Sequence, residues 1–176
     1  QETAYDQQGN KLAQGTDESG LDSEGLVALK DGTFWVSDEY GPHIVHFDAN
    51  GVEIDRINAY AQDTRRRSGY LLPAEYANRR PNRGMEGLTI TPDKKKLVGI
   101  LQSSMSHPDA SVANSDLVRI VMIDLESQAV SQYLYQQEAG STTHSNTAIT
   151  ALNDNSFLVA ERDDDFYKDN PKAFKR

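Results

Sequence analysis

The feature that most constrains this 176-residue chain is a segment that occurs three times at nearly equal spacing. Each copy has an apolar run, a turn and a second apolar run that ends in polar or acidic residues; the copies span 22–39, 83–102 and 146–163. Glu24 lies 62 residues before Glu86, and Thr147 lies 61 residues after Glu86. A repeat of this period predicts one supersecondary unit used several times.

The repeated unit has the pattern of a meander of short strands. Asp31-Gly32 and Asn50-Gly51 separate apolar runs, and such dipeptides are typical of tight β-hairpin turns. The expected strands are 25–29, 33–37, 44–48 and 52–57, then 88–91, 97–102, 117–124 and 129–135, then 148–152 and 156–161, with a short strand at 11–13. Apolar residues on both faces of these strands indicate sheets that are packed on both sides.

Repeated four-stranded meanders are the blades of a β-propeller, so we predict an all-β propeller with about two and a half antiparallel blades. The expected parts are an N-terminal arm at 1–20, a blade at 21–58, an insertion at 59–83 with a short helix near 74–78, a blade at 84–136 and a partial blade at 145–165. A β-sandwich of hairpins is the alternative. Since propellers close with four to eight blades, the remaining blades are expected from a missing part of the chain or from another chain.

The composition of the chain limits the kinds of molecule that it can bind. The net charge of −9 makes nucleic acid and anionic membrane surfaces poor partners, and no apolar run is long enough for membrane insertion. Because cysteine is absent, disulfides, thiol catalysis and cysteine-type zinc sites are excluded. Acidic clusters suit hard cations, so the carboxylates are the first candidates for a functional site.

The repeat brings carboxylates to corresponding points. Glu24 and Glu86 come just before the first expected strand of their units, and the first strand of each blade lines the channel of a propeller. The candidate metal ligands are Glu24, Asp38, Glu39, Glu86, Glu161 and Asp163. Carboxylates held together repel unless a cation lies between them, and Ca²⁺ accepts such oxygen ligands in flexible geometry. The alternative is that Glu24 and Glu86 only accept backbone hydrogen bonds in a turn.

Arginines and one histidine form the second set of candidates. The candidate substrate-binding residues are Arg79, Arg80, Arg83 and Arg162. Guanidinium groups bind carboxylates and phosphates through two donors, which predicts an anionic substrate; salt bridges to nearby acids are the alternative. His144 precedes the third copy and is a candidate general base, with an exposed loop histidine as the alternative.

Four of these segments, in this order, resemble the phytase-like domain family, whose members are described by an esterase-like activity of phytase. The segments are 22–26 (DSEGL), 31–42 (DGTFWVSDEYGP), 80–88 (RPNRGMEGL) and 157–163 (FLVAERD). The resemblance implies a β-propeller, frequently exported and bacterial, with hydrolysis of phosphate or carboxylate esters and use of calcium. A periplasmic or extracellular location is therefore expected. The Glu-Gly-Leu start is also similar to the Glu-Gly-Pro start of calcium-dependent lactonase propellers.

Together these observations favour a calcium-dependent hydrolase of a small anionic ester. Glu24 and Glu86 would hold the ion and take part in catalysis with His144. Two alternatives stay open: a non-catalytic, calcium-stabilised propeller that binds a ligand, and a lactonase-type esterase.

Overall fold

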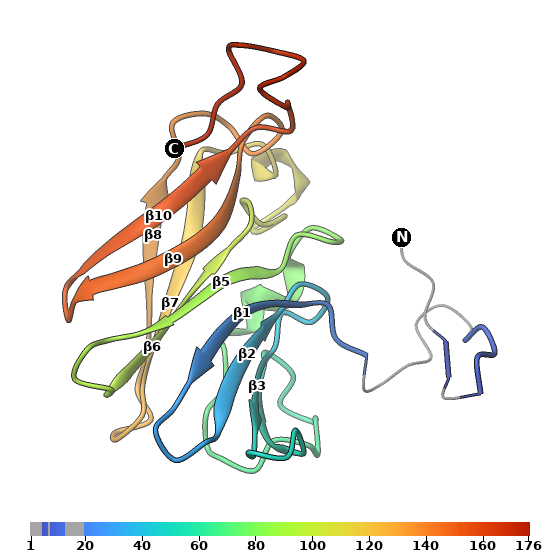
Figure 1. Cartoon of the computed structure of the whole chain (residues 1–176), viewed down its shortest axis with the longest axis vertical. Coiled ribbons are helices and arrows are strands. Elements are labelled where there is room, and N and C mark those ends of the chain that lie inside the picture. Colours follow the sequence, from blue (N-terminus) through green and yellow to red (C-terminus); the bar gives the residue numbers. More distant parts are fainter. Residues whose placement is uncertain (1–4, 7, 13–19) are drawn as a thin grey trace.

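The computed structural model describes residues 5–6, 8–12 and 20–176, and it is almost entirely β-structure (Figure 1). The first sheet contains β1 (Ser23–Ala28), β2 (Phe34–Asp38), β3 (Ile44–Phe47) and β4 (Glu53–Ile57). The second contains β5 (Met85–Ile90), β6 (Lys96–Leu101), β7 (Leu117–Asp124) and β8 (Val130–Gln136), and the third contains β9 (Ser145–Asn153) and β10 (Ser156–Arg162). Two short 3₁₀ helices, η1 (Ala74–Asn78) and η2 (Ala110–Val112), lie in the insertions.

Each sheet is an antiparallel meander in chain order, which confirms the predicted all-β, blade-like architecture. The hairpin turns form where the dipeptides predicted them. Asp31 Oδ1 accepts hydrogen bonds from the Thr33 backbone and hydroxyl, at 3.0 and 2.8 Å. Gly32 and Gly51 take φ values of +89° and +79°, a region that favours glycine, so these turns depend on their glycines.

The C-terminal residues pair with the outer edge of the third sheet through an isolated bridge between Arg162 and Lys175. Asp163 N donates to Phe174 O, and Glu161 and Arg176 exchange two backbone hydrogen bonds of 2.7 and 2.9 Å. These residues therefore pair with the edge of β10 as β3 pairs with β2. In the N-terminal arm, Lys11 forms an isolated bridge with Tyr5; the rest of the strand predicted at 11–13 includes Ala13, which lies outside the described residues.

The first strands of the three sheets lie side by side, β1 against β5 and β5 against β9 (Figure 1). Glycines permit this approach. A Cβ on Gly25 would lie 2.5 Å from Leu88 N, and a Cβ on Gly87 would lie 2.8 Å from Ile149 N. Either distance is too short for any other residue at these points. The Glu-Gly-Leu motif thus places a glycine where one blade meets the backbone of the next.

The insertion between the first two blades completes the core. Tyr70, Leu72 and Tyr76 from this insertion are buried in one apolar cluster with Ile57 of β4 and Leu97 of β6. The Tyr70 hydroxyl donates a 2.9 Å hydrogen bond to the Leu125 backbone carbonyl of the second blade. The predicted insertion at 59–83 therefore packs against both of the first two blades and joins them.

One correction concerns the start of the inner strands. The sequence placed Glu24 and Glu86 before their strands, whereas both lie inside β1 and β5 at irregularities in the pairing register. A third irregularity between β9 and β10 leaves Thr147 as the extra residue. A β-bulge turns a side chain away from the regular alternation of a strand. The bulges therefore aim the residues at these three repeat positions in a common manner.

Candidate functional site

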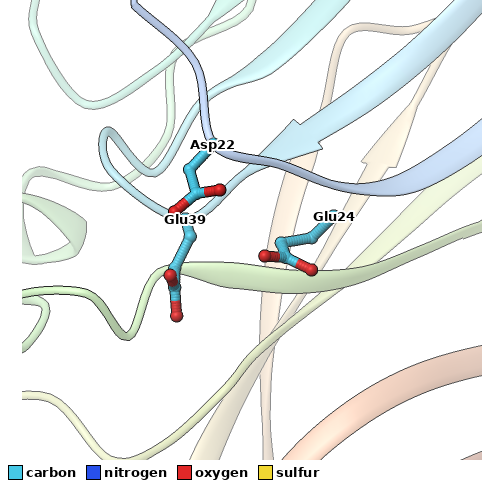
Figure 2. Close-up of side chains that lie close together, drawn as sticks. All are labelled: Asp22, Glu24 and Glu39. Atoms are coloured by element: carbon cyan, nitrogen blue, oxygen red, sulfur yellow. The ribbon is translucent and has the colours of Figure 1, made fainter. Parts of the chain in front are cut away.

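Three carboxylates converge at the end of the first blade where β1 begins and β2 ends. Asp22 precedes β1, Glu24 lies at the bulge in β1, and Glu39 directly follows β2. One carboxylate oxygen from each lies within 4.8 Å of the others (Figure 2). Glu39 N donates to Asp22 O at 2.9 Å, which ties the two chain segments together at this point. Glu39 is buried at 4% exposure, Asp22 is half-buried and Glu24 is exposed.

A glutamine from the second blade connects this group to a fourth carboxylate. Gln102 Nε2 donates to Glu39 Oε1 at 2.8 Å and to Glu86 Oε2 at 2.9 Å. All three side chains are buried. The amide group of Gln102 therefore holds carboxylates from two neighbouring blades in one arrangement, and it supplies a proton donor to each.

The local electrostatics follow from burial and like charge. Burial, followed by repulsion from Glu86, Asp22 and Glu24, raises the pKa of Glu39 to about 8. Burial and the charge of Glu24 raise the pKa of Glu86 to about 7, although the Gln102 hydrogen bond and the charge of Arg162 oppose this rise. Near neutral pH the group therefore either retains protons or needs a positive partner. Its ligand atoms are all oxygen, which suits a hard divalent cation.

Asp38, another predicted metal ligand, binds backbone N–H groups in the interior of the first blade. It is fully buried, and its two oxygens accept hydrogen bonds from the backbone N–H groups of Asp22 and Gly41. Burial raises its pKa. Asp38 thus fixes the loop that carries Asp22, and it is not part of the three-carboxylate group.

Glu161 and Asp163 form hydrogen bonds within and beside the third blade. Glu161 is buried and accepts hydrogen bonds from the Tyr135 hydroxyl and from Glu138 N, the latter at 3.1 Å. Asp163 accepts from Phe174 N at 2.7 Å and forms an ion pair with Lys175. Because Glu161 pairs with Asn146 as Asp38 pairs with Ser23, the two buried acids hold corresponding points in their blades.

Two predicted substrate-binding arginines bind the protein itself. Arg80 Nη1 donates to the carbonyls of Ala113 and Ser141, each at 3.0 Å. Arg83 Nη1 donates to Ser145 Oγ at 3.0 Å. These bonds join the first insertion to the second blade and to the start of the third. Both arginines therefore have structural partners at Nη1, and their binding of an anion stays a prediction.

The remaining candidates are Arg162, Arg79 and His144, and each lies in a different environment. Arg162 forms an ion pair with Asp164, yet its charge also acts on Glu86. Arg79 has a buried Nε without a hydrogen-bond partner among the described residues. His144 contacts the ring of Phe174 edge-on and the hydroxyl of Thr143. Neither His144 nor Arg79 belongs to the three-carboxylate group.

A family model for phytase-like proteins, described as esterase-like activity of phytase, matches residues 2–176. The chain belongs to this family. A curated relative of this phytase-like chain is an uncharacterized secreted protein of Arthroderma benhamiae, 36% identical over 104 residues. That match covers 49% of this chain and 20% of the relative, so the chain spans only a fraction of the relative's length. Among the described residues of this phytase-like chain, no helix is long and apolar enough to cross a membrane.

Sequence reasoning missed two residues of the site, Asp22 and Gln102. Asp22 N is bound by Asp38, so its place depends on a loop contact that no periodicity predicts. For Gln102, by contrast, the sequence contains a signal, which is its position at the end of the second strand of its blade. Gln102 N bonds to Gly84 O as Glu39 N bonds to Asp22 O, and Arg162 pairs with Ser145 at the same point of the third blade. Glu39, Gln102 and Arg162 are therefore equivalent, and an alignment of the three strand exits would have placed Gln102 in the site.

Proposed function

We propose that this phytase-like chain is a calcium-dependent hydrolase of phosphate or carboxylate esters. The observation that supports this most strongly is the convergence of three carboxylates within 4.8 Å at one point, beside the buried Glu86–Gln102 pair. Asp22, Glu24 and Glu39 would hold the ion. Such a group fits a cation because ionisation of Glu39 is opposed by its neighbours, and a bound positive charge removes that opposition.

Bound calcium would supply a Lewis acid for the ester oxygen and for a water molecule. Gln102 would keep Glu39 turned toward the other two carboxylates. Glu86 would hold or accept a proton near neutral pH, because its pKa lies at about 7. Arg162, whose charge acts on Glu86, would face the anionic part of a small ester substrate.

The non-catalytic alternative has a specific observation in its favour. His144, the candidate general base, contacts Phe174 and Thr143 rather than the acidic group. A calcium-stabilised propeller that binds an anionic ligand without hydrolysing it would need no such base. The secreted relative supports an extracellular location for either function, and calcium is abundant enough outside cells for a weak site to be occupied.

Calcium binding is tested first, by titration calorimetry on the whole chain. Glu24→Gln removes a ligand charge at an exposed position, so the fold is expected to survive while calcium affinity falls by at least about tenfold. Glu126→Gln, a matched change of an exposed carboxylate outside the group, leaves affinity unchanged. Absence of calcium binding to the unmodified chain would contradict the proposal.

Turnover is tested with a phosphate monoester, a carboxylate ester and a lactone, each with and without chelator. Hydrolysis that stops when chelator is added supports the calcium-dependent hydrolase, and the ester that is hydrolysed fastest identifies the substrate class. Calcium binding with a raised melting temperature but no turnover of any substrate supports the binding module. Lactone hydrolysis alone would favour the lactonase.

A further inference from the structure

A cavity of about 190 Å³ lies beside the outer strands of the second blade. Its walls come from the loop at 103–116 and from the point where β7 begins and β8 ends, at which Arg119 pairs with Leu134. None of the residues that line the cavity belongs to the three-carboxylate group. The ligand of this cavity is therefore a question separate from calcium binding.

Hydrogen bonds hold the loop that forms one wall of the cavity. Ser104, which lines the cavity, donates from Oγ to Ala113 O at 2.6 Å. Arg80 Nη1 donates to the same carbonyl at 3.0 Å, and Ser141 Oγ donates to Ser115 O at 2.9 Å. The loop is therefore tied to itself and to residues on both sides of it in the sequence. Because the wall is fixed in this way, a ligand binds without the cost of ordering a loop.

One part of the lining is apolar, and it consists of Met105, Val112, Leu117 and Leu134. Met105 is 4% exposed and Leu134 is 63% exposed, so this apolar part runs from the interior to the surface. A dry cavity of about 150 Å³ holds one benzene ring. The volume of the present cavity therefore suits one ring or a short acyl chain together with one polar group.

The polar part of the lining offers hydrogen-bond donors. Arg119 Nη1 donates to Gln132 Oε1 at 2.8 Å and to Glu75 Oε1 at 3.5 Å, and these contacts orient the guanidinium group. Among the described residues, Arg119 Nε and Nη2 have no hydrogen-bond partner. His107 also lines the cavity, and an imidazole donates from at least one ring nitrogen. No described residue of the lining is acidic, so the lining favours an anionic group although the chain has a net charge of −9.

We propose that this cavity binds a small carboxylate that carries one ring or a short acyl chain. The apolar portion of the ligand packs on the four apolar side chains, and its carboxylate accepts hydrogen bonds from Nε and Nη2 of Arg119. A guanidinium group and a carboxylate match in charge and in the spacing of two parallel hydrogen bonds. Recognition thus requires both portions of the ligand, and it adds a binding site to the proposed hydrolase.

The experiment is an NMR titration of the isotope-labelled whole chain with benzoate, benzyl alcohol and acetate. Benzoate is expected to shift the amide signals of the lining residues and to saturate in the millimolar range. Benzyl alcohol keeps the ring without the charge, and acetate keeps the charge without the ring. Each of these two should bind at least about tenfold more weakly than benzoate.

Two substitutions separate the contributions of charge and apolar surface. Arg119→Gln should raise the dissociation constant of benzoate by at least about tenfold and leave that of benzyl alcohol unchanged. Arg67→Gln, a matched change of an exposed arginine outside the lining, should change neither. Leu134→Glu places a negative charge on the apolar wall and should also weaken benzoate binding by about tenfold, whereas Leu158→Glu, at 59% exposure on β10, should not.

Benzoate shifts that increase linearly without saturation would overturn the proposal. Equal weakening of benzoate and benzyl alcohol by Arg119→Gln would also overturn it, because the guanidinium would then not bind the carboxylate. Dispersed amide signals verify that each variant is folded, and Leu134→Glu, at an exposed position, provides the test if Arg119→Gln does not fold. All titrations contain chelator, so their outcome is independent of the proposed calcium site.

Discussion

Replacement of Glu39 by glutamine should make the metal-free protein more stable at alkaline pH. In the folded protein Glu39 loses its proton only near pH 8, against 4.5 for an unshifted glutamate. Since the folded pKa is the higher one, the protonated carboxyl contributes stability that is complete below about pH 4.5 and is lost as the pH rises through about 8. At roughly 1.4 kcal/mol per pKa unit, the loss of unfolding free energy across the whole titration amounts to about 5 kcal/mol.

The assay is urea unfolding in the presence of chelator at about pH 5 and about pH 8. Glu39→Gln keeps an oxygen that accepts the hydrogen bond of Gln102, but it carries no charge. We expect the unmodified chain to lose several kcal/mol of unfolding free energy between the two pH values and the variant to lose much less. Glu126→Gln, at an exposed turn, serves as the control. If the unfolding free energies of Glu39→Gln and of the unmodified chain showed the same pH dependence, ionisation of Glu39 within the acidic group could not be the cause of the loss of stability.

Three further predictions follow from the same contacts. Gln102→Leu should weaken calcium binding by about tenfold in calorimetry because it releases Glu39, whereas Gln137→Leu, at a buried glutamine with other partners, should not. Calcium affinity should rise with pH up to about 8, by as much as about tenfold per pH unit for each proton released, and a flat profile would exclude buried carboxyls as ligands. Gly87→Ala should lower the unfolding free energy by about 2 kcal/mol in urea because its Cβ meets Ile149 N at 2.8 Å, and Gly51→Ala, which meets nothing within 4 Å, should cost only about 1 kcal/mol.

The sheets could be predicted because their determinants are local. Apolar runs mark the strands, and turns such as Asp31-Gly32 mark where the chain reverses. The repeat then assigns the strands to blades. The bulges at Glu24 and Glu86 could not be predicted, because a bulge adds one residue to a strand without a change in its apolar pattern. For this reason the sequence placed both glutamates outside strands that in fact contain them.

The structure brings some of the predicted ligands together and separates others, and the reason is the direction in which each side chain points. Glu24 and Glu39 were named as candidate ligands and do converge, but Asp38 and Glu161 were named with them and instead accept backbone hydrogen bonds in the interior. Composition cannot separate these cases, because adjacent residues of a strand face opposite sides. Asp38 and Glu39 are neighbours in sequence, yet one fixes a loop and the other faces the neighbouring blade.

The three copies of the repeat share their backbone structure, which defines the fold. They differ in the side chains at equivalent positions, and these differences bear on the proposed function. At the exit of the second strand the three blades carry a carboxylate at Glu39, a carboxamide at Gln102 and a guanidinium at Arg162. At the bulge the third blade replaces the two glutamates with Thr147. Because backbone positions are equivalent, this progression from negative to positive is a property of the side chains alone. A structural role common to all blades would favour one residue type at each point, so the gradient is the feature that the proposed function uses: a cation beside the first blade, and the anionic group of an ester toward the third.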